Sequence, residues 1–240
     1  MKKVLITGAT SGIGEALSVH YQTLGYEVVA CGRQPDKLAK LASYRNVSSI
    51  AVDLCDEQQV MLKMQQLGKL DLVILNAGSC EYMDDAKNFD GQLFARVINS
   101  NLIAMGYCLA ALLPQIPAGG QLALLGSSAS YLPFSRAEAY GASKAAVAYL
   151  ARSLALDLKA QQIDVSLVSP GFVKTPLTDK NDFAMPMQIS AEEAAKQIAN
   201  GLQKRVFDIH FPKKFTLILK TLSLLPDSWW RFISTRILQK

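Results

Sequence analysis

Short apolar runs alternate with longer amphipathic stretches along most of this 240-residue chain. The runs have the length of strands and are apolar on both faces, which is typical of a parallel sheet with helices on both sides. The stretches between them have helical periodicity. The expected strands are 3–7, 26–31, 48–54, 70–78, 121–128, 163–171 and 206–211, and the expected helices are 12–25, 35–44, 56–68, 86–113, 140–159 and 191–204.

Right-handed crossovers between such strands predict an α/β fold with a doubly wound parallel β-sheet. No internal repeat or linker interrupts residues 1–210, so we expect them to form one domain. Residues 211–240 form a basic amphipathic extension that is not expected to fold independently. Ligands of such sheets bind outside the carboxyl ends of the strands, so the residues that follow each strand are the candidates for function.

Positive charge is concentrated at the C-terminal end of the chain. The net charge is +5, and residues 210–240 hold six basic residues against the single acid Asp227, which alone gives +5. The rest of the chain is therefore close to neutral, which argues against a broad nucleic-acid-binding face. The six basic residues are Lys213, Lys214, Lys220, Arg231, Arg236 and Lys240.

The cysteines, histidines and apolar runs argue against several other classes of protein. The four cysteines form no CxxC pair, which favours reduced thiols in a cytoplasmic protein over a disulfide framework or a zinc site. Two distant histidines, His20 and His210, give no support for a metal centre. No signal peptide is expected before the first strand, and no apolar run reaches the roughly 18 residues of a transmembrane helix.

Glycines cluster between the first strand and the first helix, in the segment TGATSGIG. Gly8, Gly12 and Gly14 permit a tight turn and the close approach of a pyrophosphate, to which the helix N-terminus offers N–H groups. This predicts a dinucleotide site, although the spacing GxxxGxG differs from the commoner GxGxxG. The second strand ends in CGR with no acid, and Arg33 suits the extra phosphate of NADP(H), so NADP(H) is expected rather than NAD(H).

The segment YGASK places Tyr140 and Lys144 four residues apart at the start of a helix. The two side chains share one helix face, where the lysine would favour the phenolate and lower the tyrosine pKa from about 10. Such a pair suits a general acid/base that works near neutral pH. The alternative, from these five residues alone, is a surface tyrosine beside an extended lysine.

The chain resembles the short-chain dehydrogenase/reductase family in six motifs that occur in the family's order. They are TGATSGIG (7–14), LNAG (75–78), SNL (100–102), GSSAS (126–130), YGASK (140–144) and SPGFVKTPL (169–177). The resemblance covers about residues 1–210 and implies a Rossmann fold. It also implies an NADP(H)-dependent oxidoreductase that interconverts a small-molecule carbonyl and an alcohol by hydride transfer.

By this resemblance the catalytic residues are Asn101, Ser127, Tyr140 and Lys144. Tyr140 matches the general acid/base, and Lys144 matches the lysine that lowers its pKa and binds the nicotinamide ribose. Asn101 matches the helix asparagine that holds a proton-relay water. Ser127 precedes Tyr140 by thirteen residues, which is the family's usual spacing, whereas Ser128 would need a deletion.

The resemblance also assigns residues to the cofactor. Residues 53–54 match the adenine pocket, 76–78 the adenine-ribose side and 170–175 the loop around the nicotinamide. NADP-specific relatives often carry a basic residue where this chain has Ser11, so the choice of cofactor depends mainly on Arg33. The full set is Gly8, Thr10, Ser11, Gly12, Ile13, Gly14, Arg33, Asp53, Leu54, Asn76, Ala77, Gly78, Tyr140, Lys144, Pro170, Gly171, Val173 and Thr175.

Two other functions compete with this interpretation. The main one is a non-catalytic NADP(H)-binding redox sensor or membrane-associated scaffold, which has no need of a complete catalytic set. A nucleotide-sugar epimerase or dehydratase fits less well, because such relatives carry a longer C-terminal substrate domain. Family relatives are commonly dimers or tetramers, so a homodimer or homotetramer that forms through residues 86–113 and 138–159 is expected.

Two C-terminal segments bear on the substrate and on the location of the protein. Residues 175–190, with Met185 and Met187, are expected to form a mobile lid, or else an ordinary loop with buried methionines. Residues 211–240 combine paired tryptophans with Lys and Arg, which is typical of a helix on an anionic membrane surface. A wall of the substrate pocket and a subunit contact are the alternatives. Membrane contact would add a peripheral location at the inner face of a membrane and favour a lipophilic substrate.

Overall fold

Seven parallel strands form a single sheet in the computed structural model, which describes residues 1–238 and their side chains up to Thr235. The strand order is β3-β2-β1-β4-β5-β6-β7, so the direction of winding reverses between β1 and β4. The prediction of a doubly wound parallel sheet is confirmed. The strands are β1 (Lys3–Thr7), β2 (Glu27–Gly32), β3 (Val47–Ala51), β4 (Leu72–Leu75), β5 (Gln121–Leu125), β6 (Asp164–Pro170) and β7 (Asp208–Phe211).

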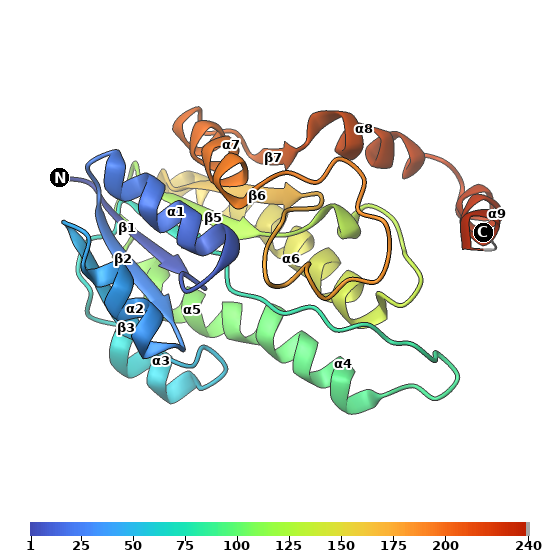
Figure 1. The fold of residues 1–240 in the computed structure, drawn as a ribbon. Helices are drawn as coiled ribbons and strands as arrows, with labels where there is room; N and C mark the ends of the chain where they lie inside the picture. Colours follow the sequence, from blue (N-terminus) through green and yellow to red (C-terminus); the bar gives the residue numbers. More distant parts are fainter. Residues whose placement is uncertain (239–240) are drawn as a thin grey trace.

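Helices cover both faces of the sheet (Figure 1). On one face lie α1 (Gly12–Thr23), α2 (Pro35–Ala42) and α7 (Ala191–Gln203). On the other face lie α3 (Glu57–Met64), α5 (Ala104–Leu112) and α6 (Glu138–Asp157), with α4 (Gly91–Ile98) packed on α6. Along β1 the completely buried Val4 and Ile6 pack on the face covered by α1, α2 and α7. Leu5 packs on the opposite face, because successive side chains of a strand point to alternate faces.

Several strands end earlier than the apolar runs predict. β5 ends at Leu125 instead of residue 128, and β4 ends at Leu75, so that 76–78 form the exit of the run predicted over 70–78. The residues that follow leave the sheet and line a cavity at its edge. The apolar and small residues beyond each strand are therefore loop residues of the candidate site.

The long helix predicted over residues 86–113 begins at Gly91, because Asp90 caps it by accepting hydrogen bonds from the N–H groups of Gln92 and Leu93 at 2.9 Å. A π-helical segment, η1 (Asn99–Ile103), separates α4 from α5. The helical run Gly91–Gln115 is long and apolar enough to cross a membrane, contrary to the sequence expectation. Its α5 part buries Cys108 and other apolar side chains beneath the sheet, which is the packing of a core helix.

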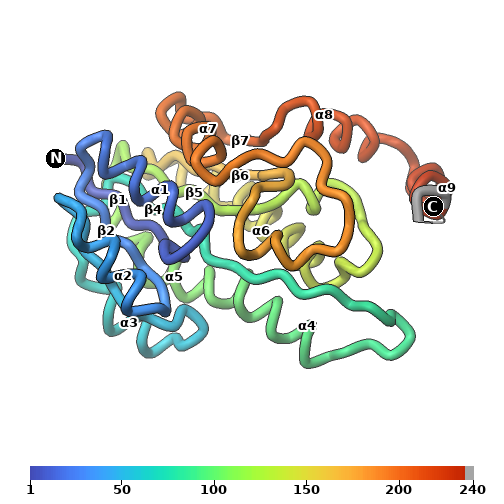
Figure 2. The backbone as a smooth tube through the Cα atoms, in the orientation of Figure 1, coloured from blue at the N-terminus to red at the C-terminus, as the bar shows by residue number. Residues whose placement is uncertain are grey.

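The C-terminal extension forms two helices separated at Pro226. They are α8 (Lys213–Leu222) and α9 (Asp227–Leu238), and Gln239 and Lys240 lie outside the described residues. Figures 1 and 2 show α8 directly after β7 and α9 at the end of the molecule far from the N-terminus. Tyr149 and Leu156 of α6 are exposed on the helix where a subunit contact is expected, and that contact stays a prediction.

Gly14 and Gly106 provide a matched test of the packing after β1. A Cβ at Gly14 would lie 2.2 Å from the carbonyl oxygen of Gly8, whereas nothing lies within 4 Å of a Cβ at the exposed Gly106 of α5. We expect Gly14→Ala to lower the free energy of unfolding by about 2–3 kcal/mol. Gly106→Ala should raise it by up to about 1 kcal/mol through helix propensity. Urea unfolding followed by circular dichroism measures both, and equal stabilities would contradict the packing.

Candidate active site

A cavity of about 340 Å³ lies at the carboxyl ends of the strands. Its wall contains residues that follow β1 to β6, together with Tyr140 and Lys144 of α6. All of the predicted cofactor residues except Gly14 line this cavity. All of the predicted catalytic residues except Asn101 line it as well. The lining residues that the sequence analysis missed are Gly32, Gln34, Val52, Cys55, Ser79, Ser100, Leu125, Gly126, Pro176, Leu177 and Thr178.

The turn after β1 forms a glycine-rich cradle at one end of the cavity. Gly8 and Gly12 have φ values of 65° and 55°, a region that favours glycine. A Cβ at Gly8 would lie 2.9 Å from the Cα of Ala77, and one at Gly12 would lie 2.8 Å from Cγ2 of Thr175. Ser11 precedes α1 and makes no side-chain cap, so the first N–H groups of α1 stay available beside the cavity. This arrangement fits the pyrophosphate of a dinucleotide.

The exits of β1 and β4 are joined by hydrogen bonds centred on Thr7, which the sequence analysis did not single out. The Thr7 hydroxyl accepts hydrogen bonds from the backbone N–H of Asn76 at 2.9 Å and of Ala77 at 3.1 Å. Nδ2 of Asn76 donates to the carbonyl oxygen of Thr7 at 2.9 Å. Gly14 packs against this junction, since a Cβ there would lie 2.6 Å from Nδ2 of Asn76. Gly14 therefore shapes the turn from behind.

Arg33 lies at the rim of the cavity, directly after β2. Its side chain is exposed and forms no ion pair with the described carboxylates. The nearby Asp53 accepts a hydrogen bond from the N–H of Cys55 at 3.1 Å, which stabilises the turn after β3. The positive charge of Arg33 is thus available to an anionic ligand. No group of three His, Cys, Asp or Glu that could hold a metal ion occurs among the described residues.

Ser127, Tyr140 and Lys144 converge on the other end of the cavity. A side-chain hydrogen bond joins Ser127 to Tyr140. Lys144 is only 4% exposed, and its Nζ donates to the carbonyl oxygen of Leu125 at 2.8 Å. The same Nζ lies 5.8 Å from the ring centroid of Tyr140. The shared face predicted from YGASK is therefore present, and Gly78 leaves room beside it, since a Cβ there would lie 3.4 Å from Nζ.

Burial controls the pKa values of this pair. It raises the pKa of Tyr140 to about 12, aided by the nearby Cys80 and opposed by the hydrogen bond with Ser127. Burial also lowers the pKa of Lys144 to about 8. The expectation that Lys144 lowers the pKa of Tyr140 is wrong for this structure. The physical reason is that removal from water disfavours both the phenolate and the ammonium.

Asn101 is completely buried behind the cavity, in η1. Its Nδ2 donates to the carbonyl oxygen of Ser79 and to the hydroxyl of Ser143, both at 2.9 Å. Its Oδ1 accepts from the N–H of Ser79 at 2.7 Å. The amide therefore uses both of its protons within the protein and joins the loop after β4 to α6. The expectation that Asn101 holds a proton-relay water stays a prediction, and the side-chain amide is already used for these contacts.

An aromatic row, defined as Phe215, Phe172, Phe183 and Tyr82, runs from α8 toward Tyr140, and the sequence analysis missed it. Successive ring centroids are 5.5 Å, 6.1 Å and 5.5 Å apart. Tyr82, at the end of the row, is hydrogen-bonded to Cys80. It lies near enough to Tyr140 for Tyr140 to raise the pKa of Tyr82. None of the four residues lines the cavity itself, but the row lies beside it, since Phe172 stands between the lining residues Gly171 and Val173. In the sequence, only the PGF segment at 170–172 pointed to an aromatic ring near the site. The other rings of the row lie in three separate segments, so the sequence alone did not group them.

Arg136 ties the predicted lid to the loop after β4. In Figure 2 the segment between β6 and α7, in orange, forms a wide loop. The Arg136 guanidinium pairs with Asp182 of that loop at 2.8 Å and with Asp84 at 2.7 Å, and it lies 5.5 Å from the ring centroid of Tyr82. Met185 is half-buried within the loop and Met187 is exposed. The mobility of the loop stays a prediction.

Known proteins resemble this chain over most of its length. The family model described as short chain dehydrogenase matches residues 2–206. An uncharacterized oxidoreductase of Myxococcus xanthus is 29% identical over 94% of this chain and 93% of its own length. A "probable NADP-dependent dehydrogenase" of Haemophilus influenzae is 33% identical over 70% and 69%. A short chain dehydrogenase/reductase of Burkholderia phymatum, solved in complex with NAD, has a similar fold, with a TM-score of 0.81 and 22% identity over 91% and 92%.

The family match contains the whole candidate site. The glycine turn, Ser127, Tyr140 and Lys144 all lie within residues 2–206 and line one cavity. The resemblance noted from six sequence motifs is therefore confirmed by the family model and by the fold. This chain belongs to the short-chain dehydrogenase family and is an oxidoreductase of that family.

Proposed function

We propose that the protein is an NADP(H)-dependent oxidoreductase that interconverts a lipophilic carbonyl compound and the corresponding alcohol. The observation that carries this proposal is the convergence of Ser127, Tyr140 and Lys144 on a cavity that begins at the glycine turn. The turn and the N-terminus of α1 would hold the pyrophosphate, and residues 170–175 would lie along the nicotinamide. When bound, the nicotinamide ring supplies or accepts the hydride.

Tyr140 acts as the general acid in reduction and as the general base in oxidation. Its raised pKa keeps the phenol protonated near neutral pH, the state that can donate a proton to a carbonyl oxygen. Ser127, which is hydrogen-bonded to Tyr140, donates a hydrogen bond to the same oxygen and stabilises the charge that develops there. The protonated Tyr140 is the form that carbonyl reduction requires.

Lys144 returns the proton to Tyr140 and binds the ribose next to the nicotinamide. A pKa of about 8 allows Nζ to exchange a proton near neutral pH, and its bond to Leu125 keeps it beside the tyrosine ring. Asn101 supports this step as a positioning residue, because it binds Ser79 and Ser143 on either side of the pair. Lys144 therefore contacts the reacting groups, whereas Asn101 acts on them only by positioning its neighbours.

The choice of NADP(H) depends on Arg33. Its exposed guanidinium carries a positive charge at the rim of the cavity, where an acidic residue would repel the extra phosphate. The Haemophilus influenzae relative is named as NADP-dependent, whereas the Burkholderia phymatum structure contains NAD. The family accommodates either cofactor, so the residue at position 33 decides between them.

A lipophilic substrate fits the aromatic row. Phe172, Phe183 and Tyr82 offer apolar rings on the approach to Tyr140, and the cation that lies over one of these rings is Arg136. Arg136 is already paired with Asp84 and Asp182. The competing function, cofactor binding without turnover, would leave the hydrogen-bonded Ser127–Tyr140 pair without a use. A cytoplasmic location stays a prediction.

Arg33→Ala tests the choice of cofactor. We expect the affinity for NADPH to fall about tenfold or more, as for a lost charge-assisted phosphate contact, and the affinity for NADH to change little. Fluorescence titrations with both dinucleotides measure this, with the exposed Arg45→Ala as the control for a lost surface charge. If the affinities for NADPH and NADH fall equally, or if neither falls, Arg33 does not bind the extra phosphate of NADP(H).

Tyr140→Phe tests the catalytic role. We expect the reduction of a panel of lipophilic ketones and aldehydes with NADPH to slow by about 10²–10⁴-fold, as for a lost general acid, with NADPH binding nearly unchanged. Tyr149→Phe, an exposed residue of the same helix, is the control and should keep full activity. A wild-type protein that binds NADPH and turns over nothing in the panel would favour the non-catalytic function.

The pH dependence follows from the raised pKa of Tyr140. Oxidation of an alcohol needs the phenolate, whose fraction rises tenfold per pH unit below a pKa of about 12. The logarithm of kcat/KM for oxidation should therefore rise with a slope near one between about pH 6 and 8, while reduction stays nearly flat. Loss of the Lys144 proton adds a second ionisation near pH 8. An oxidation profile that is flat below pH 8 would mean that Tyr140 ionises below neutrality.

A further inference from the structure

The C-terminal helices expose a group of large apolar side chains to solvent. Leu217 and Ile218 of α8 are 52% and 53% exposed. In the turn between the helices Leu224 is 84% exposed, and Trp229 of α9 is 62% exposed. We name these residues, together with Leu225, the outer face of α8–α9. Such a concentration of exposed leucine, isoleucine and tryptophan within thirteen residues marks an interaction surface.

The opposite side of the same helices is already packed on the protein. Thr216 and Leu219 of α8 are buried, and Trp230 of α9 is 7% exposed. Nε1 of Trp230 donates to the carbonyl oxygen of Pro133 at 2.8 Å, while its neighbour Trp229 points into solvent. The extension is therefore held in place without the outer face. The exposed side chains are not needed to bury its inner side.

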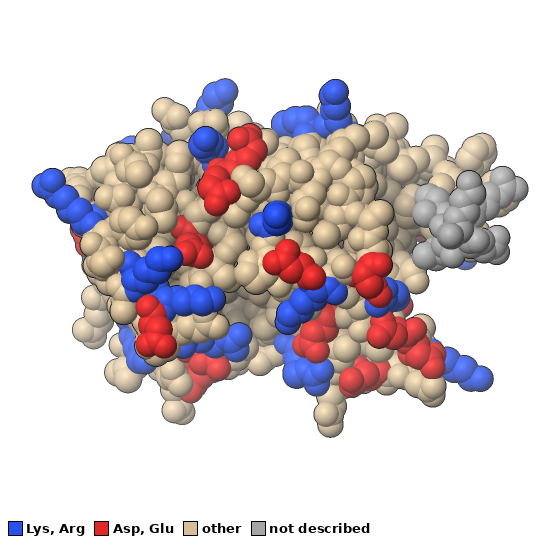
Figure 3. Space-filling view, in the orientation of Figure 1, with Lys and Arg blue, Asp and Glu red and all other residues tan. Residues whose placement is uncertain are grey.

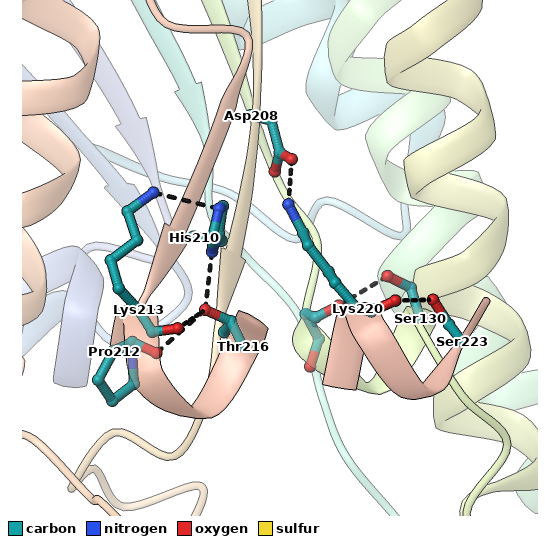
Figure 4. A network of polar contacts seen from close by, with 9 residues as sticks. Ser130, Asp208, His210, Pro212, Lys213, Thr216, Lys220 and Ser223 are labelled. Carbon is teal, nitrogen blue, oxygen red and sulfur yellow. Dashed lines mark hydrogen bonds and ion pairs between the residues drawn. The ribbon is translucent and has the colours of Figure 1, made fainter. Parts of the chain in front are cut away.

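Polar contacts fix α8 to the end of β7, as Figure 4 shows. His210 of β7 shares a hydrogen bond of 2.7 Å with Thr216 and lies 3.1 Å from Nζ of Lys213. Lys220 forms an ion pair with Asp208 at the other end of the helix. Because both ends of α8 are bound to one strand, the outer face is presented on a firm support.

Basic residues border the outer face. Lys214 and Arg231 are exposed, and Asp227 is the only acid between them. Lys213 is exposed as well, but its Nζ is bound to His210. Lys220 is neutralised by Asp208 from the sheet, so it is not counted here. On the side of the molecule in Figure 3, the surface over α8 displays Lys and Arg but no Asp or Glu. The border therefore complements an anionic surface.

The inner and outer sides of α8 bear on the two alternatives for this segment, a wall of the substrate pocket and a subunit contact. Phe215 contacts Phe172, the first step of the aromatic row, so the inner side of α8 contributes a wall next to the site. A symmetric contact through the outer face would gather the exposed cations of both copies in one interface, with Asp227 as the only acid of this segment to balance them, and like charges repel. An occupant with negative charge and an apolar interior suits the outer face better than a second copy.

We propose that the outer face of α8–α9 docks on the surface of an anionic lipid bilayer. The leucines, Ile218 and Trp229 enter the boundary between headgroups and acyl chains, and Lys214 and Arg231 contact anionic headgroups. Docking in this way keeps Phe215 and the aromatic row close to the lipid. This proposal concerns binding alone and does not depend on the cofactor or the reaction proposed above.

The test uses the full chain and its own tryptophans. Trp229 and Trp230 are the only two in the sequence, and only Trp229 is exposed, so the emission change on docking reports the outer face. Vesicles of phosphatidylcholine with about a third phosphatidylglycerol should shift the emission to the blue and carry the protein upward in flotation. Pure phosphatidylcholine vesicles should bind at least roughly tenfold more weakly.

Matched variants distinguish docking through the outer face from nonspecific binding through other exposed apolar side chains. Leu217→Ser with Ile218→Ser should reduce binding to the anionic vesicles roughly tenfold or more. Leu24→Ser with Leu62→Ser, which removes two apolar side chains that are 55% and 82% exposed elsewhere, should leave binding unchanged. Circular dichroism confirms that both pairs fold.

Three outcomes would overturn the proposal. They are the absence of binding to anionic vesicles, equal binding by both variant pairs, and equal binding to neutral vesicles. If the wild type does not bind vesicles and light scattering shows that only the Leu217/Ile218 variant dissociates an oligomer, the outer face is a subunit interface instead.

Discussion

Hydrogen bonds from Asn76 and Ala77 to Thr7 hold the exits of β1 and β4 together at the point where the strand order reverses. The rest of the site depends on this junction. Gly14 has no side chain, so α1 can begin directly behind the junction and present its N-terminus to the cavity. Because all the strands are parallel, the residues that follow the other strands meet at the same edge.

Burial at this edge sets the chemistry as well as the shape. The same exclusion of water that stabilises the sheet raises the pKa of Tyr140 and lowers that of Lys144, so both side chains are driven toward their neutral forms. Each keeps one polar contact, Tyr140 with Ser127 and Lys144 with Leu125. A proton donor and a proton reservoir thus lie side by side at one end of the cavity.

The C-terminal extension connects this site to the molecular surface. Its inner side touches the aromatic row through Phe215, and its outer side displays Leu217, Ile218 and Trp229 beside exposed cations. One helix therefore serves as both a wall and a surface. The His210–Thr216 hydrogen bond and the Lys220–Asp208 ion pair hold α8 in this position.

The sequence by itself determined the sheet, the glycine turn and the spacing of Tyr140 and Lys144, because periodicity, turn conformation and the i, i+4 relation are local properties. Only the tertiary structure decided the pKa directions of that pair, since burial depends on neighbours from other strands. It also directed the Asn101 amide to Ser79 and Ser143 and brought Arg136 to carboxylates 52 and 46 residues away. Contacts over such separations leave no periodic signal in a single sequence, because the fold alone brings their partners together.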